Sequence, residues 1–317
     1  MKKILASSFL LVVLAASCSK DDRETVSERT AVSIESVSVP TKGFATESAD
    51  TVGLTLMESG KKPYNGRTSG YSNVKYIKKA GEETWGTDSP IMISSTPGVL
   101  YAYYPYSASV SDIREIPVRS SLNGTDYMYA DSVTNVNSLN PSVSLILHHA
   151  LARLTVRIWK DSIYDGGCEF NGISISGNGV AISGTLDATD GTITAVPAVL
   201  QFTTDPVSFA SDTMRADFLI VPALVSAERQ EVTLICSIDG KDYEVPLKGD
   251  NGVVMEPGKN SSVSLSMNGN TGFLSVVSVG VEEWNAGDGS TSDVCIVPGG
   301  LIVMEKDDCQ NGGEIVL

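Results

Sequence analysis

The two histidines of this 317-residue chain, His148 and His149, are adjacent. Neighbouring side chains in an extended segment point to opposite faces, so the pair cannot hold one metal ion together. A serine–histidine–aspartate triad would have to use one of them, yet no Gly-x-Ser-x-Gly elbow presents a serine. We therefore expect one histidine to be buried and hydrogen-bonded at a distorted strand and the other to be exposed. The sequence predicts no enzyme activity, no cofactor and no metal.

Three polar loops contain weaker signals of nucleotide or calcium binding. Residues 177–179 (Gly-Asn-Gly) break the dinucleotide-binding pattern and sit among strands, so we interpret them as a turn. Residues 187–191 contain two acidic positions of a calcium loop but lack the distal glutamate, which favours a hairpin tip. Residues 285–293 form another Asp/Gly loop, for which calcium binding stays an open alternative.

Four tyrosines, at positions 101, 103, 104 and 106, could offer stacking faces to a sugar. Alternation along an extended strand instead makes Tyr101 and Tyr103 a core pair on one face. Pro105 is expected to end that strand.

Most of the cysteines lie in the second half of the chain. Cys236 shares a strand face with Val232, Leu234 and Ile238, which predicts a buried thiol. No cysteine pair has CxxC spacing, so zinc is not indicated. Four cysteines allow three disulfide pairings, among which the sequence does not choose: Cys168, Cys236, Cys295 and Cys309.

The fifth cysteine, Cys18, follows an export signal. Lys2 and Lys3 precede an apolar run to Ala16, which is shorter than the roughly 20 residues of a membrane-spanning helix. Its end resembles a bacterial lipobox, in which the cysteine thiol is diacylated and becomes the new N-terminus. We expect residues 1–17 to be the signal peptide and residues 18–30 to be a tether. An ordinary cleaved signal with an incidental cysteine is the alternative.

The composition limits the class of partner. The chain has 38 acidic and 23 basic residues and a net charge of −15, which argues against binding nucleic acid. With 42% hydrophobic and 19% charged residues, it is expected to be globular. A chain of this length buries about 75% of its extended surface, enough for one large core or two ordinary ones.

Beyond residue 30 the pattern indicates short strands separated by Gly, Pro, Asn and Asp. In residues 262–267 every second residue is apolar, and residues 232–238 and 243–247 flank an Asp-Gly turn. No segment after the signal sustains a helical period for three turns. We therefore predict an all-β chain of antiparallel sandwiches, with domains at 31–160 and 161–317. The second domain would end in an extension from about residue 285.

Two segments change the face on which their apolar residues lie. Residues 32 and 34 share one parity and residues 37 and 39 the other; the same change separates residues 143–147 from residues 154–158. Because pleating has a period of two, each change requires a bulge, a crossing or a break. The second change is expected at residues 148–152.

Several segments, in order along the chain, resemble the fimbrillin family, the subunits of type V pili in Bacteroidota. The lipobox is followed by Ser-Lys-Asp-Asp, which resembles a surface-export signal of these bacteria. The other matching segments are Val37–Gly43, Tyr101–Tyr106, Asp126–Ala130, Leu147–Leu154, Pro257–Lys259 and Val279–Trp284.

The resemblance implies two transthyretin-like antiparallel β-sandwich domains with few short helices, and a lipoprotein at the cell surface or in a fimbrium. In stalk fimbrillins, a trypsin-like protease cuts after an early basic residue and releases the first strand. Lys42 matches that position, with Arg29 as the alternative; the plain reading of Lys42 is an exposed turn residue. The C-terminal tail of a neighbouring subunit then fills the space that the released strand has left. The candidate donor residues in this chain are Val294, Ile296, Leu301, Val303, Ile315 and Leu317.

The tail has an alternative position as well. It could fold back on its own domain, held by a Cys295–Cys309 bridge, which would suit an anchor or tip subunit. The expected partners are other fimbrillin subunits, the outer membrane through the lipid anchor, and ligands on host or bacterial surfaces.

The predicted function is a structural fimbrial subunit or fimbria-associated surface lipoprotein that contributes to adhesion. The alternative is a surface glycan-binding lipoprotein of a nutrient-uptake system, which the Asp/Gly loops and exposed aromatics would serve equally well. Saturable micromolar binding to a glycan array would favour the alternative.

Overall fold

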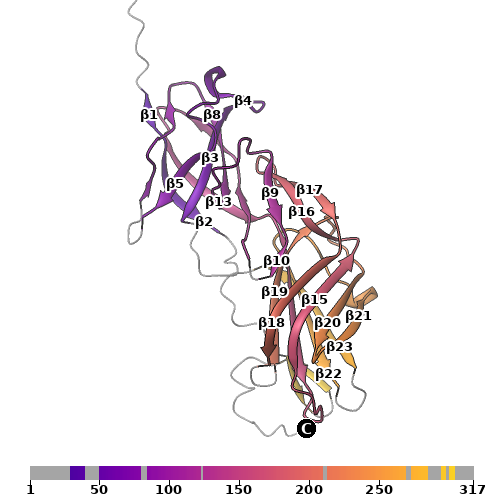
Figure 1. The fold of residues 1–317 in the computed structure, drawn as a ribbon. Helices are drawn as coiled ribbons and strands as arrows, with labels where there is room; N and C mark the ends of the chain where they lie inside the picture. Colours follow the sequence, from indigo (N-terminus) through magenta and orange to yellow (C-terminus); the bar gives the residue numbers. More distant parts are fainter. Residues whose placement is uncertain are drawn as a thin grey trace, which may run out of the picture.

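The computed structural model describes residues 29–39, 50–79, 84–122, 124–209, 213–268, 273–284, 294–297 and 300–303. In these residues the chain consists of β-strands, and its helical elements are two single 3-10 turns, Tyr64–Gly66 and Gly249–Asn251. The strands form two β-rich bodies that lie end to end (Figure 1). Within the described part of the chain, no helix has the length and apolar character needed to cross a membrane. The prediction of an all-β chain is confirmed.

The first body is a nine-stranded sheet that curls around its own core. Its outermost strands, β2 and β6, contact each other. Strands β12 (Val133–Val136) and β4 (Lys62–Pro63) pair beside the main path, and β1 (Thr30–Ala31) pairs with β7 (Met92–Ile93). The main path runs through β2 (Ser33–Ser38), β13 (Ser142–His149), β11 (Met128–Ala130), β8 (Gly98–Tyr104), β3 (Thr51–Glu58), β5 (Val74–Lys78) and β6 (Trp85–Gly86).

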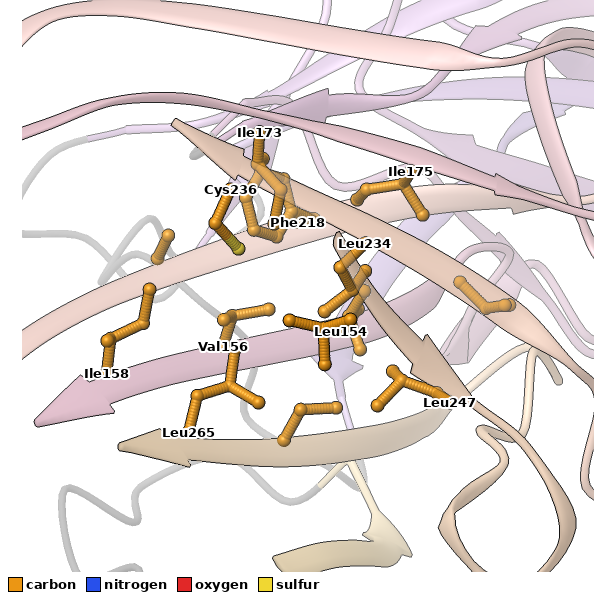
Figure 2. Close-up of a cluster of buried hydrophobic side chains, with 14 of the residues drawn as sticks. Leu154, Val156, Ile158, Ile173, Ile175, Phe218, Leu234, Cys236, Leu247 and Leu265 are labelled. Carbon is orange, nitrogen blue, oxygen red and sulfur yellow. The ribbon is translucent and has the colours of Figure 1, made fainter. Parts of the chain in front are cut away.

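The second body consists of two sheets with a core between them (Figure 2). The larger sheet contains β17 (Thr192–Pro197), β16 (Val180–Asp187), β19 (Thr213–Pro222), β14 (Ala152–Lys160), β22 (Lys259–Met267) and β23 (Leu274–Glu283), with β9 (Ile116–Arg119) and β10 (Ser121–Leu122) attached. The smaller sheet contains β18 (Leu200–Ser208), β15 (Glu169–Gly177), β20 (Val232–Ile238) and β21 (Lys241–Leu247).

The chain passes between the two bodies three times. It leaves the first body after β8, adds β9 and β10 to the second body, returns for β11 to β13, and leaves again before β14. In Figure 1, β9 and β10 keep the purple of the early sequence although they lie with the second body. The buried hydroxyl of Ser120 donates to the carbonyl of Ala181 at 2.6 Å and accepts from the amide of Val221 at 2.7 Å, so this excursion is bound into the larger sheet.

Strand pairing assigns two segments differently from the sequence analysis. Residues 116–122 and 152–160 fall inside the N-terminal domain expected at 31–160, but they pair with strands of the second body. Two pairings also depart from the expected antiparallel pattern, because β2 runs parallel to β13 and β14 runs parallel to β22. Alternation along a strand fixes which face is buried but says nothing about the partner strand.

Both predicted face changes are confirmed. In β2, Ile34 pairs with Val143 and Ser36 pairs with Ser144, so Glu35 is the extra residue of a bulge. The second change is a break at residues 150 and 151, where the chain leaves β13 and begins β14 in the other body. Leu145 and Leu147 therefore belong to the core of the first body, and Leu154, Val156 and Ile158 to that of the second.

Other local predictions are confirmed as well. Asp239 and Gly240 both have left-handed φ angles, 51° and 72°, in the two-residue turn between β20 and β21. Cys236 is fully buried with a free thiol, and burial raises the pKa of this thiol to about 12. The thiol therefore stays protonated at neutral pH, in a form that is a poor nucleophile. Cys168 is also buried; Cys309 and the side chain of Cys295 lie outside the described residues.

Replacing Leu154 by alanine should destabilise the second body. Leu154 is fully buried between the two sheets (Figure 2), so the substitution leaves a cavity and should lower the free energy of unfolding by about 2–5 kcal/mol. A urea melt measures the change. The matched control is Leu139→Ala, because the Leu139 side chain is 92% exposed and should change stability little. Equal midpoints for the two variants would contradict the core position of Leu154.

Candidate functional site

A stacked pair of aromatic rings joins the two bodies. The imidazole of His149, at the end of β13, lies flat on the indole of Trp284, which directly follows β23; the ring centroids are 4.0 Å apart and the planes differ by 9°. His149 Nδ1 is 2.8 Å from Asp126 Oδ2, and all three side chains are buried. His148 points the other way and its Nε2 lies 3.0 Å from Asp131 Oδ2 near the surface. The prediction of one buried, hydrogen-bonded histidine is thus confirmed for His149, whereas His148, which was expected to be exposed, is half-buried.

A buried ion pair lies close to the indole as well. The guanidinium carbon of Arg153 is 5.7 Å from the centroid of the Trp284 ring, within the range of a cation–π contact. Arg153 donates to Asp217 Oδ1 from Nε at 3.1 Å and from Nη2 at 2.8 Å, and Thr155 Oγ1 donates to the same oxygen at 2.6 Å. Arg215 Nε donates to Asp217 Oδ2 at 2.8 Å. We call the side chains of Asp126, His149, Arg153, Asp217 and Trp284 the junction cluster.

The buried carboxylate of Asp217 is held by two arginines and a hydroxyl. Burial alone would raise the pKa of Asp217, but the hydrogen bond from Arg215, the charge of Arg153 and the hydrogen bond from Thr155 outweigh burial and lower it below its usual value. A buried carboxylate is tolerated when it is paired and hydrogen-bonded in this way. Asp217 is therefore ionised in the folded protein, and its role in the cluster is structural.

Backbone hydrogen bonds also connect the chain segments next to the junction cluster. The amide of Trp284 donates to the carbonyl of Gly258 at 2.7 Å, and the amide of Gly258 donates to the carbonyl of Leu151 at 3.0 Å. Gly258 has a φ of +75°, a conformation that favours glycine. The segments that carry the family resemblance around residues 126, 149, 258 and 284 therefore meet at one point, which the sequence alone did not show.

The sequence analysis missed Arg153 and Asp217. A signal was present, because each is a charged residue inside an otherwise largely apolar run: Arg153 in Ala-Leu-Ala-Arg-Leu, Asp217 in Ala-Asp-Phe-Leu-Ile-Val. Such residues are rarely buried unless paired, so each predicts a partner, but 64 positions separate them and their pairing is not local.

The N-terminal strand lies at the edge of the first body. Among the described strands, β2 pairs with β13 alone, and Ile34 and the preceding Val32 are buried in the core. The amide of Val32 donates to the carbonyl of Ile91 at 2.9 Å, and the hydroxyl of Tyr76 donates to the carbonyl of Val32 at 3.1 Å. Burial raises the pKa of Tyr76 above its ordinary value, so its phenol remains the donor at neutral pH.

Only some of the predicted processing and donor residues fall within the described part of the chain. Arg29 is exposed directly before β1, whereas Lys42, like Cys18, lies outside the described residues. In the tail, β24 (Val294–Val297) and β25 (Gly300–Val303) form an antiparallel hairpin that pairs with no other described strand. Val294 is opposite Val303 and Ile296 is opposite Leu301 in its register. Ile315 and Leu317 also lie outside the described residues.

Several of the other sequence candidates lie in strands and turns. Tyr101 and Tyr103 are buried as a pair, and their strand ends at Tyr104, before Pro105. Residues 178–179 and 188–191 are the turns between β15, β16 and β17. No group of metal-ligating side chains occurs in the described part of the chain, and the 285–293 loop falls outside it.

Comparison with solved structures shows the same fold. A candidate cell adhesion protein from Bacteroides uniformis is 20% identical, with a TM-score of 0.59, over 81% of this chain and 99% of that one. A second candidate cell adhesion protein, from Bacteroides ovatus, is 15% identical, with a TM-score of 0.59, over 82% of this chain and all of that one. These identities show similarity of fold. No curated protein sequence matches the chain.

The architecture therefore places the chain among two-body, all-β proteins of this kind. The sequence profile of the family described as Fimbrillin-like matches residues 38–284, which is more than half of the chain. The chain belongs to the fimbrillin-like family, as its sequence motifs predicted. Membership in this family, which is not one of enzymes, implies a location at the cell surface and association with fimbrial subunits.

Replacing Asp217 by asparagine should weaken the junction and change its acid response. Because the pKa of Asp217 is lowered in the folded state, its contribution to stability is present above pH about 4 and is lost as the pH falls through the folded-state pKa. Asp217→Asn leaves Arg153 buried without its counter-charge and should lower the free energy of unfolding at pH 7 by about 3–5 kcal/mol. Its stability should also fall less steeply between pH 4 and 2.

Urea melts at pH 7, 4, 3 and 2 measure both effects. Asp242→Asn is the matched control, because Asp242 is exposed at the start of β21. A variant with wild-type stability at pH 7 would show that the ion pair does not hold the junction.

Proposed function

We propose that the protein is a structural fimbrial subunit or fimbria-associated surface lipoprotein that assembles by strand exchange and contributes to adhesion. The proposal includes two transthyretin-like β-sandwich domains and an outer-membrane anchor at Cys18. The observation that carries it is the position of β2. This is an apolar strand at a sheet edge, close to the N-terminus and followed within a few residues by Lys42.

Release of β2 would create an acceptor site. In the part of the chain that the structure describes, the strand has β13 as its one partner, so its departure leaves the β13 edge with unpaired backbone groups. It would also uncover the core positions that Val32 and Ile34 fill. An incoming strand can satisfy such an edge through main-chain hydrogen bonds while its alternate side chains fill the vacated pockets.

The tail hairpin supplies a donor of matching character. Its residues are apolar, and in the described part of the chain β24 and β25 pair only with each other. Opening the hairpin would free either strand for a neighbouring molecule. Adhesion enters the proposal because the similar structures from Bacteroides uniformis and Bacteroides ovatus are described as candidate cell adhesion proteins.

Limited trypsin treatment of the mature protein should produce oligomer ladders on SDS gels of unboiled samples. The cut after Lys42 releases β1 and β2 and lets the tail of another copy enter. Lys42→Ala should prevent the ladder, whereas Arg29→Ala should leave it unchanged, since a cut after Arg29 precedes β2. Deleting residues 294–317 should abolish the ladder without preventing the cut. A protein that stays monomeric after cleavage at Lys42 would rule out strand exchange.

Cys18→Ala should shift the protein from the membrane fraction to the soluble fraction or leave it unprocessed. The reason is that the diacyl group, at about 0.8 kcal/mol per buried CH₂, supplies the anchor. Metabolic labelling with a fatty-acid analogue checks the lipid directly, and Cys168→Ala is the control because that buried thiol lies in the second body. Membrane recovery of Cys18→Ala at the wild-type level would contradict the lipid anchor.

A glycan-binding surface lipoprotein is the second candidate function. It is favoured by a groove in the first body that is lined by both polar and apolar side chains. Sugar binding without any ladder after trypsin treatment would favour this candidate over a subunit that assembles by strand exchange.

A further inference from the structure

The first body contains a groove of about 580 Å³. Its walls come from β3 (residues 55–57), from the segment 61–73 and from the segment 106–114 after β8. The volume falls within the range of small-molecule binding sites, about 300–1,000 Å³. None of the residues that line it belongs to β2 or to the tail hairpin.

The floor of the groove is held rigid by Asn73. Its amide nitrogen Nδ2 donates to the carbonyls of Ser107 at 3.0 Å and Val110 at 2.7 Å, and its Oδ1 accepts from the hydroxyl of Tyr103 at 2.8 Å. Its backbone amide donates to the buried hydroxyl of Thr55 at 3.0 Å. Asn73 therefore fastens two walls to each other, and such a preorganised floor lowers the entropy cost of binding.

A glycine makes this fastening possible. The Tyr103 ring crosses β3 at Gly53, where an added Cβ would come within 2.2 Å of the ring. Any larger residue would push the ring away from Asn73.

Positive charge gathers in the groove of an otherwise acidic protein. Lys61, Arg67 and Arg114 line it against a single carboxylate, that of Asp112. Arg114 is paired with Asp112 at 2.5 Å, and Lys61 is 3.3 Å from Asp190. Arg67 has no carboxylate partner among the described residues, and its side chain is exposed. One guanidinium fork is thus available to a ligand.

The rest of the lining suits a sugar ring. The half-buried ring of Tyr106 lines the groove, and the ammonium of Lys75 lies over one face of it, 5.5 Å from the ring centroid. The CH groups of a pyranose pack on aromatic surfaces of this kind. The hydroxyls of Thr68, Ser69, Ser72 and Ser111 line the groove as well and can exchange hydrogen bonds with sugar hydroxyls.

We propose that this groove binds a sugar residue that bears a carboxylate, either a uronic acid or a sialic acid. The carboxylate would accept two parallel hydrogen bonds from Arg67, the geometry that a guanidinium favours. One unpaired cation matches one carboxylate charge better than the nearly double charge of a phosphate monoester. The proposal rests on the adhesive part of the proposed function. It does not depend on assembly, because a single uncut copy contains the whole groove.

Titration calorimetry of the uncut mature protein tests it, with N-acetylneuraminic acid, glucuronic acid and galacturonic acid as probes. Glucose and galactose are the neutral controls. At least one acidic sugar should bind at least about tenfold more tightly than either neutral sugar, because hydrogen bonds to charged groups stabilise more than neutral ones. The binding should weaken with added salt. Which acid binds identifies its source, a sialylated or a uronic-acid glycan.

Substitutions at Arg67 identify the residue responsible. Arg67→Gln should weaken binding of the acidic sugar by about 10- to 100-fold, and Arg67→Lys should weaken it less. The matched control is Arg119→Gln, which removes the same charge from an exposed position on β9 outside the groove and should bind as wild type does. Thermal melts confirm that each variant is folded.

Three results would overturn the proposal: no binding of any acidic sugar at millimolar concentration, equal binding of neutral sugars, or unchanged binding by Arg67→Gln. The trypsin ladder is read independently. Loss of sugar binding with an intact ladder rejects the groove alone, and sugar binding without a ladder rejects strand exchange alone.

Discussion

The stack of His149 on Trp284 is the contact on which the arrangement of the two bodies depends. The first ring comes from the last strand of the first body and the second follows the last strand of the second body. Asp126 is hydrogen-bonded to the imidazole, and Arg153, held by Asp217, makes a cation–π contact with the indole. Buried charges demand defined partners at defined distances, whereas apolar side chains accept several packings. The junction cluster therefore specifies one relative orientation of bodies that an apolar interface alone would specify less sharply. We offer this as the physical reason why the family-like segments converge there.

Much of the local structure could be predicted from the sequence, and the failures share one cause. Alternation identified the strand faces, including the bulge at Glu35 and the break after His149, because pleating makes burial a local property. Membership of β14 in a sheet could not be predicted, since its partners β19 and β22 lie far along the chain. The same holds for the parallel pairing of β2 and for the ion pair of Arg153 and Asp217. The groove could not be predicted from the sequence for a related reason, because only the fold brings Arg67 and Tyr106 close to each other.

The groove and the junction are not independent parts of the molecule. Tyr103 and Val110 belong to the apolar cluster between the bodies, and both are hydrogen-bonded to Asn73 on the groove floor. Lys61, on the groove wall, reaches across to Asp187 and Asp190 at the tip of the β16–β17 hairpin. The shape of the groove is therefore set partly by the second body, even though every residue that lines it comes from the sequence before β9. A change in the packing between the bodies would alter the groove without touching its lining.

The triple passage of the chain between the bodies also has a mechanical meaning. Two bodies joined by one linker can be drawn apart until the linker is taut, and a chain of such units would stretch at every joint. Here tension between the ends of the molecule is shared by three backbone segments and by the ladders that β9 and β10 make with β16 and β19. Extension would require those ladders to shear while the core around Trp284 opens. Such a molecule should therefore transmit tension along its length with little extension between its two bodies.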